Sequence, residues 1–428
     1  MNKHEKFADY IAKTCYDFYE RQLPKTGKPL DKKEWTILAA ILMKNESNET
    51  LKVISICTGS KCLGKSQLSH TGDIINDCHA EILARRSFMR FLCNEILMVY
   101  SGKGSEILTK SSNSHECILK NGISFHLFIS HTPCGDASIF AKKNNASLKR
   151  SFDDFNNDEI NQNKKVKLSN YVASDIDDIF RTGAKCVVNG PQDSKTPGSS
   201  YHILGALRTK PGRGDPTLSM SCSDKIARWN ILGIQGSLLM QFLNHPVYLS
   251  TITIGQSPFC EKALDRAIYD RIKTVSNLPS GFSINKPRCV QSNLEFKCSR
   301  SISESQSSNA VPSSSCIIWN ASEKSKIEVA VGGKKQGITK KLLNSDKARC
   351  SVCKMNMFQL FHNILSALKE KPSHLRDPTV LTYKQFKECS RSYMKAKEEF
   401  LSVFKGWMEK PQNLRNFTLP GIKNLAKT

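Results

Sequence analysis

Three short motifs supply side chains that can bind a metal ion and move a proton. The imidazole of His79 and the thiols of Cys134 and Cys222 are typical zinc ligands. Zinc with three protein ligands keeps a fourth position for water and lowers the pKa of that water towards neutrality. Glu81 lies two residues after His79 and adds a carboxylate that the metal does not need. We therefore predict a zinc centre that activates water, with Glu81 as the general acid and base.

The spacing of these residues is weak evidence when it is taken alone. Nucleobase deaminases combine a His-x-Glu pair with two Cys in a compact Pro-Cys-x-x-Cys motif. That compact motif is absent, and Cys134 and Cys222 lie far apart in the chain. A single buried Cys is more often a small apolar residue than a ligand. The local sequence around each candidate ligand must therefore support a shared site.

The first motif opens a stretch with helical periodicity. From Ala80 onward, apolar residues recur at positions that share one helix face. This pattern predicts a helix with His79 and Glu81 at its start and with Asn76 or Asp77 as its N-terminal cap.

Both thiols are expected at the start of helices. Residues 125–129 read as a buried strand, and Pro133 then favours the start of a helix with Cys134 in its first turn. Cys222 likewise precedes a helical stretch. Helix N-termini favour negative charge, so both thiolates are expected to be stabilised there.

Several longer motifs resemble a known enzyme family. Six stretches are similar to the RNA-editing adenosine deaminase (ADAR-type) catalytic domain, namely residues 76–81, 221–230, 233–237, 181–186, 210–215 and 23–29. The last three resemble in particular the branch of this family that acts on tRNA, and the similarity runs from about residue 10 to residue 417. It implies hydrolytic deamination of adenosine to inosine in tRNA, at the adenosine 3′ to the anticodon of tRNA-Ala. It also implies that His79, Cys134 and Cys222 bind Zn²⁺.

The resemblance implies an α/β (α+β) fold with a cytidine-deaminase-like three-layer core, in which helices flank a central sheet. An extended helical C-terminal part would enclose inositol hexakisphosphate. Because the motifs of one site spread from residue 76 to residue 410, we interpret residues 1–428 as a single adenosine deaminase (A to I editase) domain. Residues 144–170 and 292–315 lack apolar periodicity and are expected to be disordered insertions.

A second group of residues matches the positions that hold inositol hexakisphosphate in the family. These are Asn76, Ile82, Arg85, Arg86, Lys225, Arg228, Trp229, Gln235, Ser237, Lys354, Tyr383, Lys387, Tyr393, Lys397, Trp407, Glu409 and Lys410. Tyr383 with Lys387, and Tyr393 with Lys397, are each four residues apart and share a helix face. A packed interior cannot keep so many unpaired cations unless a polyanion neutralises them. The alternative is an ordinary solvated basic surface.

Four further positions bear on this second site. Asp77 and Lys210 match family residues that relay between the metal and the inositol phosphate, although capping alone would also explain Asp77. Arg415 stands where the editing enzymes have an acidic residue, and Ser219 where they have Thr.

Composition agrees with an intracellular RNA enzyme. The formal net charge of +24 suits a polyanionic partner. Sixteen Cys without a secretory signal suggest free thiols and a metal site, and no apolar run approaches membrane-spanning length. We expect a soluble protein of the nucleus, the cytoplasm or both. Basic residues at 149–150 and 164–167 form either a bipartite import signal or a solvated loop.

We expect tRNA as the partner, with no membrane and no obligate protein partner. Lys185, Arg208 and Arg213 are candidates for phosphate contacts, and the alternative is a surface position without an assigned role. A broader editor of double-stranded RNA or mRNA is the nearest alternative, disfavoured because no separate double-strand-binding module is evident. A catalytically idle RNA-binding protein is another alternative, and the presence of Glu81 argues against it.

Overall fold

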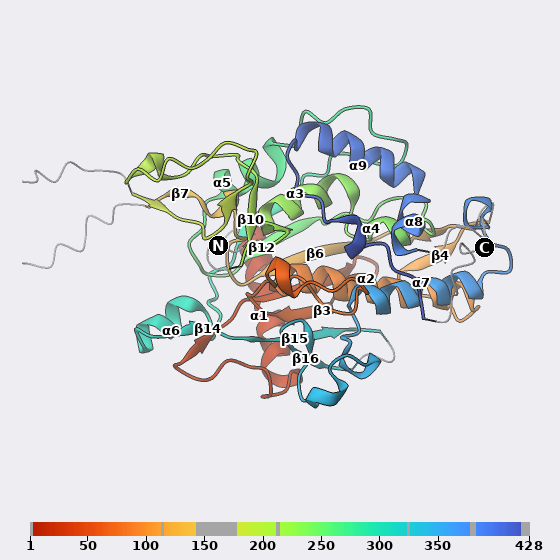
Figure 1. Cartoon of the computed structure of the whole chain (residues 1–428), viewed down its shortest axis with the longest axis horizontal. Coiled ribbons are helices and arrows are strands. Elements are labelled where there is room, and N and C mark those ends of the chain that lie inside the picture. Colours follow the sequence, from red (N-terminus) through yellow and green to blue (C-terminus); the bar gives the residue numbers. More distant parts are fainter. Residues whose placement is uncertain are drawn as a thin grey trace, which may run out of the picture.

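A mixed eight-stranded sheet forms the centre of the molecule in the computed structural model, which describes residues 3–112, 115–142, 178–210, 215–322, 326–376 and 382–420 (Figure 1). In order across the sheet, the strands are β13 (Arg288–Gln291), β12 (Thr251–Ile254), β6 (Ile123–Ile129), β2 (Leu38–Asn45), β3 (Thr50–Thr58), β15 (Ser315–Asn320), β16 (Glu328–Val331) and β17 (Lys334–Lys335). Strand β12 runs parallel to both of its neighbours, and the other pairs are antiparallel.

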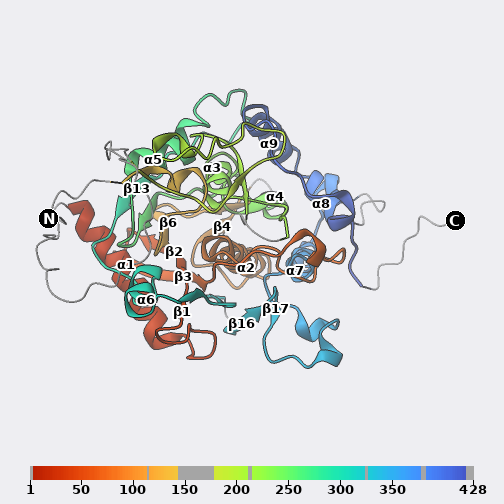
Figure 2. The ribbon, with the colours of Figure 1, turned by 60° about the vertical axis from the view of Figure 1, so that its left-hand side comes forward.

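Helices cover both faces of this sheet. Helix α1 (Lys3–Gln22) packs on one face and α2 (Ala80–Tyr100) on the other (Figure 2). Side chains alternate along β2, because successive residues of a strand point to opposite faces. Leu38 and Ala40 pack in the cluster that contains α1, whereas Ala39 and Ile41 pack in the cluster that contains α2.

The remaining elements lie around this layered centre. The other helices are α3 (Cys222–Leu232), α4 (Gly236–Met240), α5 (Glu261–Asp265), α6 (Arg300–Gln306), α7 (Lys354–Ala367), α8 (Tyr383–Glu388) and α9 (Arg391–Val403). Small sheets pair β1 (Glu34–Trp35) with β14 (Val311–Pro312), β4 (Leu108–Lys110) with β5 (Cys117–Leu119), β7 (Phe140–Ala141) with β8 (Ile179–Phe180), and β10 (Arg208–Lys210) with both β9 (Lys185–Cys186) and β11 (Ser219–Met220). One hydrophobic cluster extends from Ala39 to Leu419, so the C-terminal helices share the core of the sheet. Among the helices in the described ranges, none has the length and apolarity that crossing a membrane requires.

The predicted mixed α/β architecture with a central sheet and helices is confirmed. The strand expected at residues 125–129 lies within β6, and the helix expected after His79 is α2. The cap of α2 differs, because His79 itself is the capping residue and makes no side-chain capping bond. Asp77 instead accepts a hydrogen bond from the backbone N–H of His79 at 3.1 Å.

The helix expected to begin at Pro133 is wrong. The chain forms only a short 3-10 turn at Asp136–Ser138, after Cys134. Gly135 lies between Cys134 and this turn and has a φ of 103°. Residues with a side chain rarely adopt this backbone angle, and it does not occur in an α-helix. A Cβ atom at this glycine would lie 2.3 Å from the Oγ of Ser221. Close packing against Ser221, the residue before Cys222, therefore takes the place of a helical turn.

The Ser-rich stretch at residues 292–315 is folded in the structure, which differs from the disorder expected there. Ser299 caps α6 by accepting a hydrogen bond from the N–H of Ile302, and Ser303 and Ser313 are buried. Phe296 packs in the cluster beneath α1. The serines are therefore caps and buried hydrogen-bonding groups. The other expected insertion, residues 144–170, lies outside the described residues with both basic motifs at 149–150 and 164–167.

Candidate zinc centre and cationic cavity

The three predicted metal ligands lie together although they are far apart in the sequence. The Nδ1 atom of His79 is 3.4 Å from the Sγ of Cys222 and 4.0 Å from the Sγ of Cys134. Within the described ranges, they form the one group of His, Cys or acidic residues whose potential ligand atoms all lie within 4.8 Å of one another. One imidazole and two thiols is a donor set that zinc takes in catalytic sites, so these residues fit the metal.

The N-terminus of α3 places the Cys222 ligand. Ser221 caps this helix and accepts a hydrogen bond from the N–H of Asp224 at 3.2 Å, and the Asp224 carboxylate accepts one from the Ser221 hydroxyl at 2.6 Å. The N–H of Cys222 points to the Sγ of Cys134 at 3.4 Å. A hydrogen bond from the Cys222 thiol lowers the pKa of Cys134, and nearby Lys210 favours its thiolate further. The prediction that Cys222 opens a helix is confirmed. The expected stabilisation of its own thiolate is wrong, because burial and the neighbouring Cys134 raise the pKa of Cys222 well above its usual value.

Glu81 lies beside this centre without a structural partner. Its side chain is in the first turn of α2 and is only 2% exposed. Its Oε2 atom has no hydrogen-bond partner among the described residues. A buried carboxylate costs free energy unless it is hydrogen-bonded or neutralised, so an unpaired one next to three candidate metal ligands points to a chemical role.

A chain of charged side chains leads away from the zinc ligands. The Nζ of Lys210 lies 2.7 Å from the Sγ of Cys222 and 3.0 Å from the Oδ2 of Asp77, and Lys225 bonds to the same carboxylate. Burial opposes ionisation of Asp77, but Lys210 and Lys225 hold the pKa of this carboxyl well below its usual value. Burial also opposes the charge of Lys210, but Asp77 and the thiols raise the pKa of this ammonium well above its usual value. Asp77 and Lys210, the expected relay residues, are thus in direct contact.

A cavity of about 320 Å³ begins at the far end of this chain. Asp77 and Lys225 belong to its wall, and residues of α8 and α9 also line it. The wall includes sixteen of the residues expected to hold inositol hexakisphosphate, which are Asn76, Ile82, Arg85, Arg86, Lys225, Arg228, Trp229, Ser237, Lys354, Tyr383, Lys387, Tyr393, Lys397, Trp407, Glu409 and Lys410.

Gln235 is the expected cavity residue that lies elsewhere. Its side chain is buried, donates to the carbonyl of Leu232 at 2.8 Å and accepts from the N–H of Val247 at 3.0 Å. Both ends of the amide are therefore used to join α3 to the segment before β12. Gln235 supports the wall and does not face the cavity.

Positive charge dominates the cavity wall. Its charged residues are Arg85, Arg86, Lys225, Arg228, Lys354, Lys384, Lys387, Lys397, Lys410 and Arg415 against Asp77, Glu388 and Glu409. Burial and neighbouring cations lower the pKa of Lys354 to about 6, that of Lys387 to about 7 and that of Lys410 to about 8. These lysines cannot all keep their protons without a negative partner, so the cavity fits a polyanion.

Comparison with known proteins identifies the family. Residues 55–411 match the adenosine-deaminase (editase) domain. The chain belongs to this family of deaminase enzymes. It is 34% identical to the human protein named tRNA-specific adenosine deaminase 1, over 96% of this chain and 99% of that protein. The Drosophila melanogaster protein of the same name is also 34% identical, over 95% and 96% of the two chains. A rat double-stranded RNA-specific adenosine deaminase is 31% identical over 91% of this chain but only 31% of its own length.

Both positions that depart from the editing enzymes belong to the cavity of this deaminase. Ser219 and Arg415 line the wall. The Nη2 of Arg415 lies 3.6 Å from Glu409, and its Nε is buried without a hydrogen-bond partner in the described part of the chain. Lys384 and Glu388 also line the cavity and were not predicted. Their spacing of four residues on α8 was an available signal.

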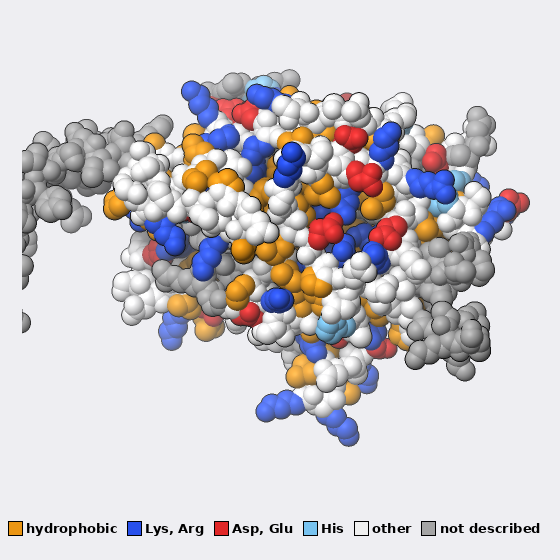
Figure 3. All heavy atoms as spheres, turned by 45° about the horizontal axis from the view of Figure 1, so that its top comes forward, with side chains coloured by type: hydrophobic (Ala, Val, Ile, Leu, Met, Phe, Trp, Pro, Cys, Tyr) orange, Lys and Arg blue, Asp and Glu red, His pale blue; other side chains and the backbone are white. Residues whose placement is uncertain are grey.

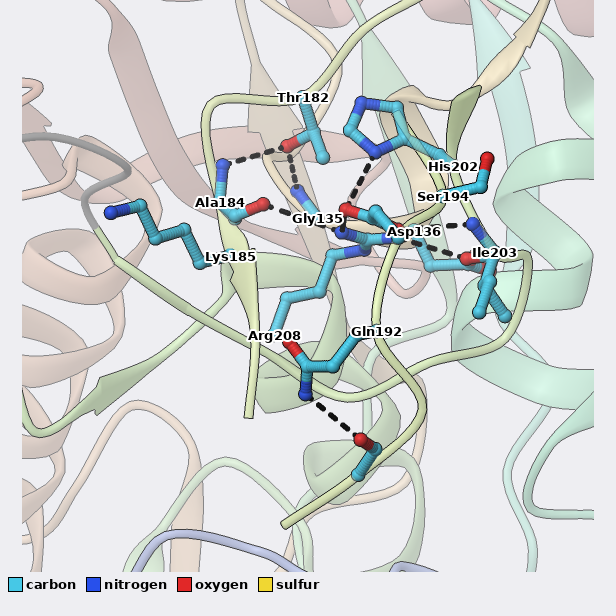
Figure 4. Close-up of polar contacts among 12 residues, drawn as sticks. Gly135, Asp136, Thr182, Ala184, Lys185, Gln192, Ser194, His202, Ile203 and Arg208 are labelled. Atoms are coloured by element: carbon cyan, nitrogen blue, oxygen red, sulfur yellow. Dashed lines mark hydrogen bonds and ion pairs between the residues drawn. The ribbon is translucent and has the colours of Figure 1, made fainter. Parts of the chain in front are cut away.

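The three basic residues that were candidates for phosphate contacts lie in different environments. Arg208 is fully buried, and its guanidinium forms two hydrogen bonds of 2.6 and 2.7 Å with Asp193 (Figure 4). It is therefore a structural residue, and the prediction that it contacts RNA is wrong. Lys185 is exposed, and Arg213 lies outside the described residues. Lys and Arg side chains are mixed with Asp and Glu on the face drawn in Figure 3, so the net charge does not form one uniform basic surface there.

Proposed function

We propose that this protein is a zinc-dependent enzyme that hydrolyses adenosine to inosine in tRNA. The observation that carries the proposal is the convergence of His79, Cys134 and Cys222 beside the unpaired carboxylate of Glu81. The relatives named tRNA-specific match this chain along almost their whole lengths, which supports tRNA as the substrate. Zinc bound by the three side chains would supply the Lewis acid that activates water.

Glu81 does the proton chemistry in this proposal. Its carboxylate accepts a proton from the attacking water and passes it to the ring nitrogen. It then accepts the proton of the hydroxyl group now on the ring carbon and passes it to the amino group, which leaves as ammonia. His79, Cys134 and Cys222 hold the metal and take no part in the proton transfer. The burial of Glu81 keeps bulk water away from the carboxylate, which favours transfer to the substrate.

The adenosine 3′ to the anticodon of tRNA-Ala is the proposed target. A base in an anticodon loop is unpaired, so an enzyme can take it into a pocket at low cost. A broader editor of duplex RNA or mRNA is the alternative, and the double-stranded RNA-specific relatives extend far beyond the region shared with this chain. A catalytically idle RNA-binding protein would have no need for the buried carboxylate of Glu81.

The proposed ligand of the cationic cavity is inositol hexakisphosphate. Its support is the excess of buried Lys and Arg in the wall, together with the lowered pKa of Lys354 and Lys387. Through Lys225, Asp77 and Lys210, a ligand in the cavity would act on Cys222 by a chain of hydrogen bonds. We include this relay in the proposal.

The proposed function is tested by incubating the purified protein with total tRNA and mapping inosine by sequencing. We expect inosine at the position 3′ to the anticodon of tRNA-Ala. Folded tRNA should react faster than a long perfect duplex or free adenosine at the same salt concentration, since phosphate contacts weaken steeply with salt. Faster deamination of the duplex would favour the editing alternative. Binding of tRNA without inosine formation would favour the idle protein.

A further inference from the structure

The segment from β8 (Ile179–Phe180) to β10 folds around a buried ion pair of Arg208 and Asp193. Arg208 donates two hydrogen bonds to Asp193. It donates a third, of 2.9 Å, to the carbonyl of Ile203, and Figure 4 labels both of these residues. Asp193 also accepts from the backbone N–H of Ile203 and contacts the ring of His202 at 2.9 Å. Burial opposes its ionisation, but the bonds from Arg208 and His202 hold the pKa of Asp193 below its usual value. These bonds tie the loop at Asp193 and Ile203 to β10.

One side chain joins this segment to the loop that carries a zinc ligand. The Oγ1 of Thr182 accepts hydrogen bonds from the N–H of Gly135 at 3.1 Å and from the N–H of Ala184 at 3.3 Å (Figure 4). Gly135 directly follows Cys134. The residues on either side of Thr182 are thus held at the edge of the zinc centre.

Two cations at this edge are exposed. The guanidinium of Arg181 lies 4.1 Å from the centre of the Tyr201 ring, and its side chain is 46% exposed. Its carboxylate neighbour, Asp178, is 3.5 Å away and is also bound by Lys142 at 2.5 Å. The side chain of Lys185 points away from the buried ion pair (Figure 4) and is exposed.

This geometry is suited to RNA. Stacking on an aromatic ring fixes the plane of a guanidinium and leaves its N–H groups free to donate to a phosphate. An exposed surface pair with one carboxylate contributes little to stability, so the Arg181 and Asp178 contact gives no sufficient reason for an arginine here. Arg181 is held against the Tyr201 ring next to Thr182, where it would meet the backbone of a strand whose base enters the zinc centre.

We infer that Arg181, oriented by Tyr201, binds a backbone phosphate of the RNA next to the adenosine that is deaminated, with Lys185 supporting the same strand. This inference rests on the proposed function and names the residue that positions the substrate. Arg181 acts on binding, not on the chemical step, because its contact is to a phosphate outside the reacting base.

The test measures tRNA binding at several salt concentrations and deamination at saturating tRNA. We compare the wild-type protein with Arg181→Ala, Arg181→Lys and a matched control, Arg21→Ala. Arg21 is an exposed arginine in the last turn of α1, on the face of the sheet opposite to α2. Zinc content and melting temperature are measured for each protein, so that loss of folding is recognised.

Arg181→Ala is expected to raise the Kd and the KM for tRNA about tenfold and to leave kcat nearly unchanged. The slope of log Kd against log salt should fall by about one, the value for one lost phosphate contact. Arg181→Lys keeps the charge without the planar stack, so its Kd should be intermediate. Arg21→Ala should bind like the wild type.

Equal Kd values and salt slopes for folded Arg181→Ala and Arg21→Ala would overturn the inference. A fall in kcat without a change in Kd would also overturn it, because the residue would then act on the zinc loop. Inosine formation by the wild-type protein tests the proposed function separately. Binding constants are obtained for every variant even without turnover, so the two failures are distinguishable.

Discussion

The identity of each zinc ligand can be tested at the level of single residues. Cys134→Ala or Cys222→Ala removes one of two sulfur donors, so we expect each variant to lose most of the one zinc ion per chain. Elemental analysis of purified protein measures this loss. Cys260→Ala is the control, because Cys260 is also partly exposed but lies outside the cluster. Stoichiometric zinc in both ligand variants would exclude this ligand set.

Glu81 is expected to matter for turnover and not for metal binding. Glu81→Gln keeps the size of the side chain but removes its ability to accept a proton. Deamination should fall by roughly 10²- to 10⁴-fold, the usual contribution of a general acid and base. Zinc content and the Kd for tRNA should change little, as measured by elemental analysis and a binding assay. Near-normal inosine formation by this variant would refute the assignment.

At the scale of elements, the parts with a local periodic signal were predictable. The apolar helix face that begins at Ala80 predicted α2, and the apolar run at residues 125–129 predicted β6. The turn after Cys134 was not predictable, because it depends on the approach of Ser221 to Gly135 from a distant part of the chain. The Ser-rich stretch was misjudged since its serines are caps and buried groups, which composition does not distinguish from a solvated linker.

The N-terminus of α3 provides a test of how an element positions a ligand. Asp224 is fully buried, accepts from Ser221 and from the N–H of Arg208, and forms an ion pair with Arg271 at 2.8 Å. Asp224→Asn removes this charge and weakens the support of Cys222. We expect zinc affinity to fall about 10- to 100-fold, as is typical when a partner behind a ligand is lost.

Competition with a zinc chelator measures that affinity. Asp270→Asn is the control, because Asp270 forms an exposed pair with Lys273 at 3.5 Å and lies outside the metal cluster. Wild-type zinc affinity in Asp224→Asn would mean that the helix holds Cys222 in place without this carboxylate.

At the scale of the whole molecule, the sequence predicted residues that the fold brings together at the two candidate sites, but it did not predict all of their contacts. The resemblance to the family predicted His79 as a metal ligand and Lys387 as a cavity residue, because motifs preserve residue types. The sequence could not show that Arg208 is buried against Asp193, so this arginine was predicted to contact RNA. The resemblance also predicted that Gln235 lines the cavity, whereas both ends of its side-chain amide bond to backbone groups. Such pairings depend on side-chain geometry between segments that only the fold brings together.

The cationic cavity makes stability depend on its ligand and on pH. In the ligand-free fold, burial and the repulsion of Arg228 lower the pKa of Lys387 to about 7. An unfolded lysine keeps its proton up to about pH 10.4, so the unfolded state binds more protons between these values. Ligand-free stability should therefore rise as pH increases from about 7 towards 10 and be lost as pH falls through about 7.

Lys387→Met should consequently have opposite effects with and without inositol hexakisphosphate. Without the ligand, the substitution removes a repelling buried cation and should raise the melting temperature by a few degrees, most strongly below about pH 7 where Lys387 is charged. With the ligand, it removes an attractive contact and should lower the melting temperature. Thermal unfolding of protein from a host that cannot make the ligand, with and without added inositol hexakisphosphate, measures both effects. Lys13→Met, on the exposed side of α1, is the control and should respond to neither condition. The same sign of change in both conditions would mean that Lys387 has a packing role and that no polyanion neutralises it.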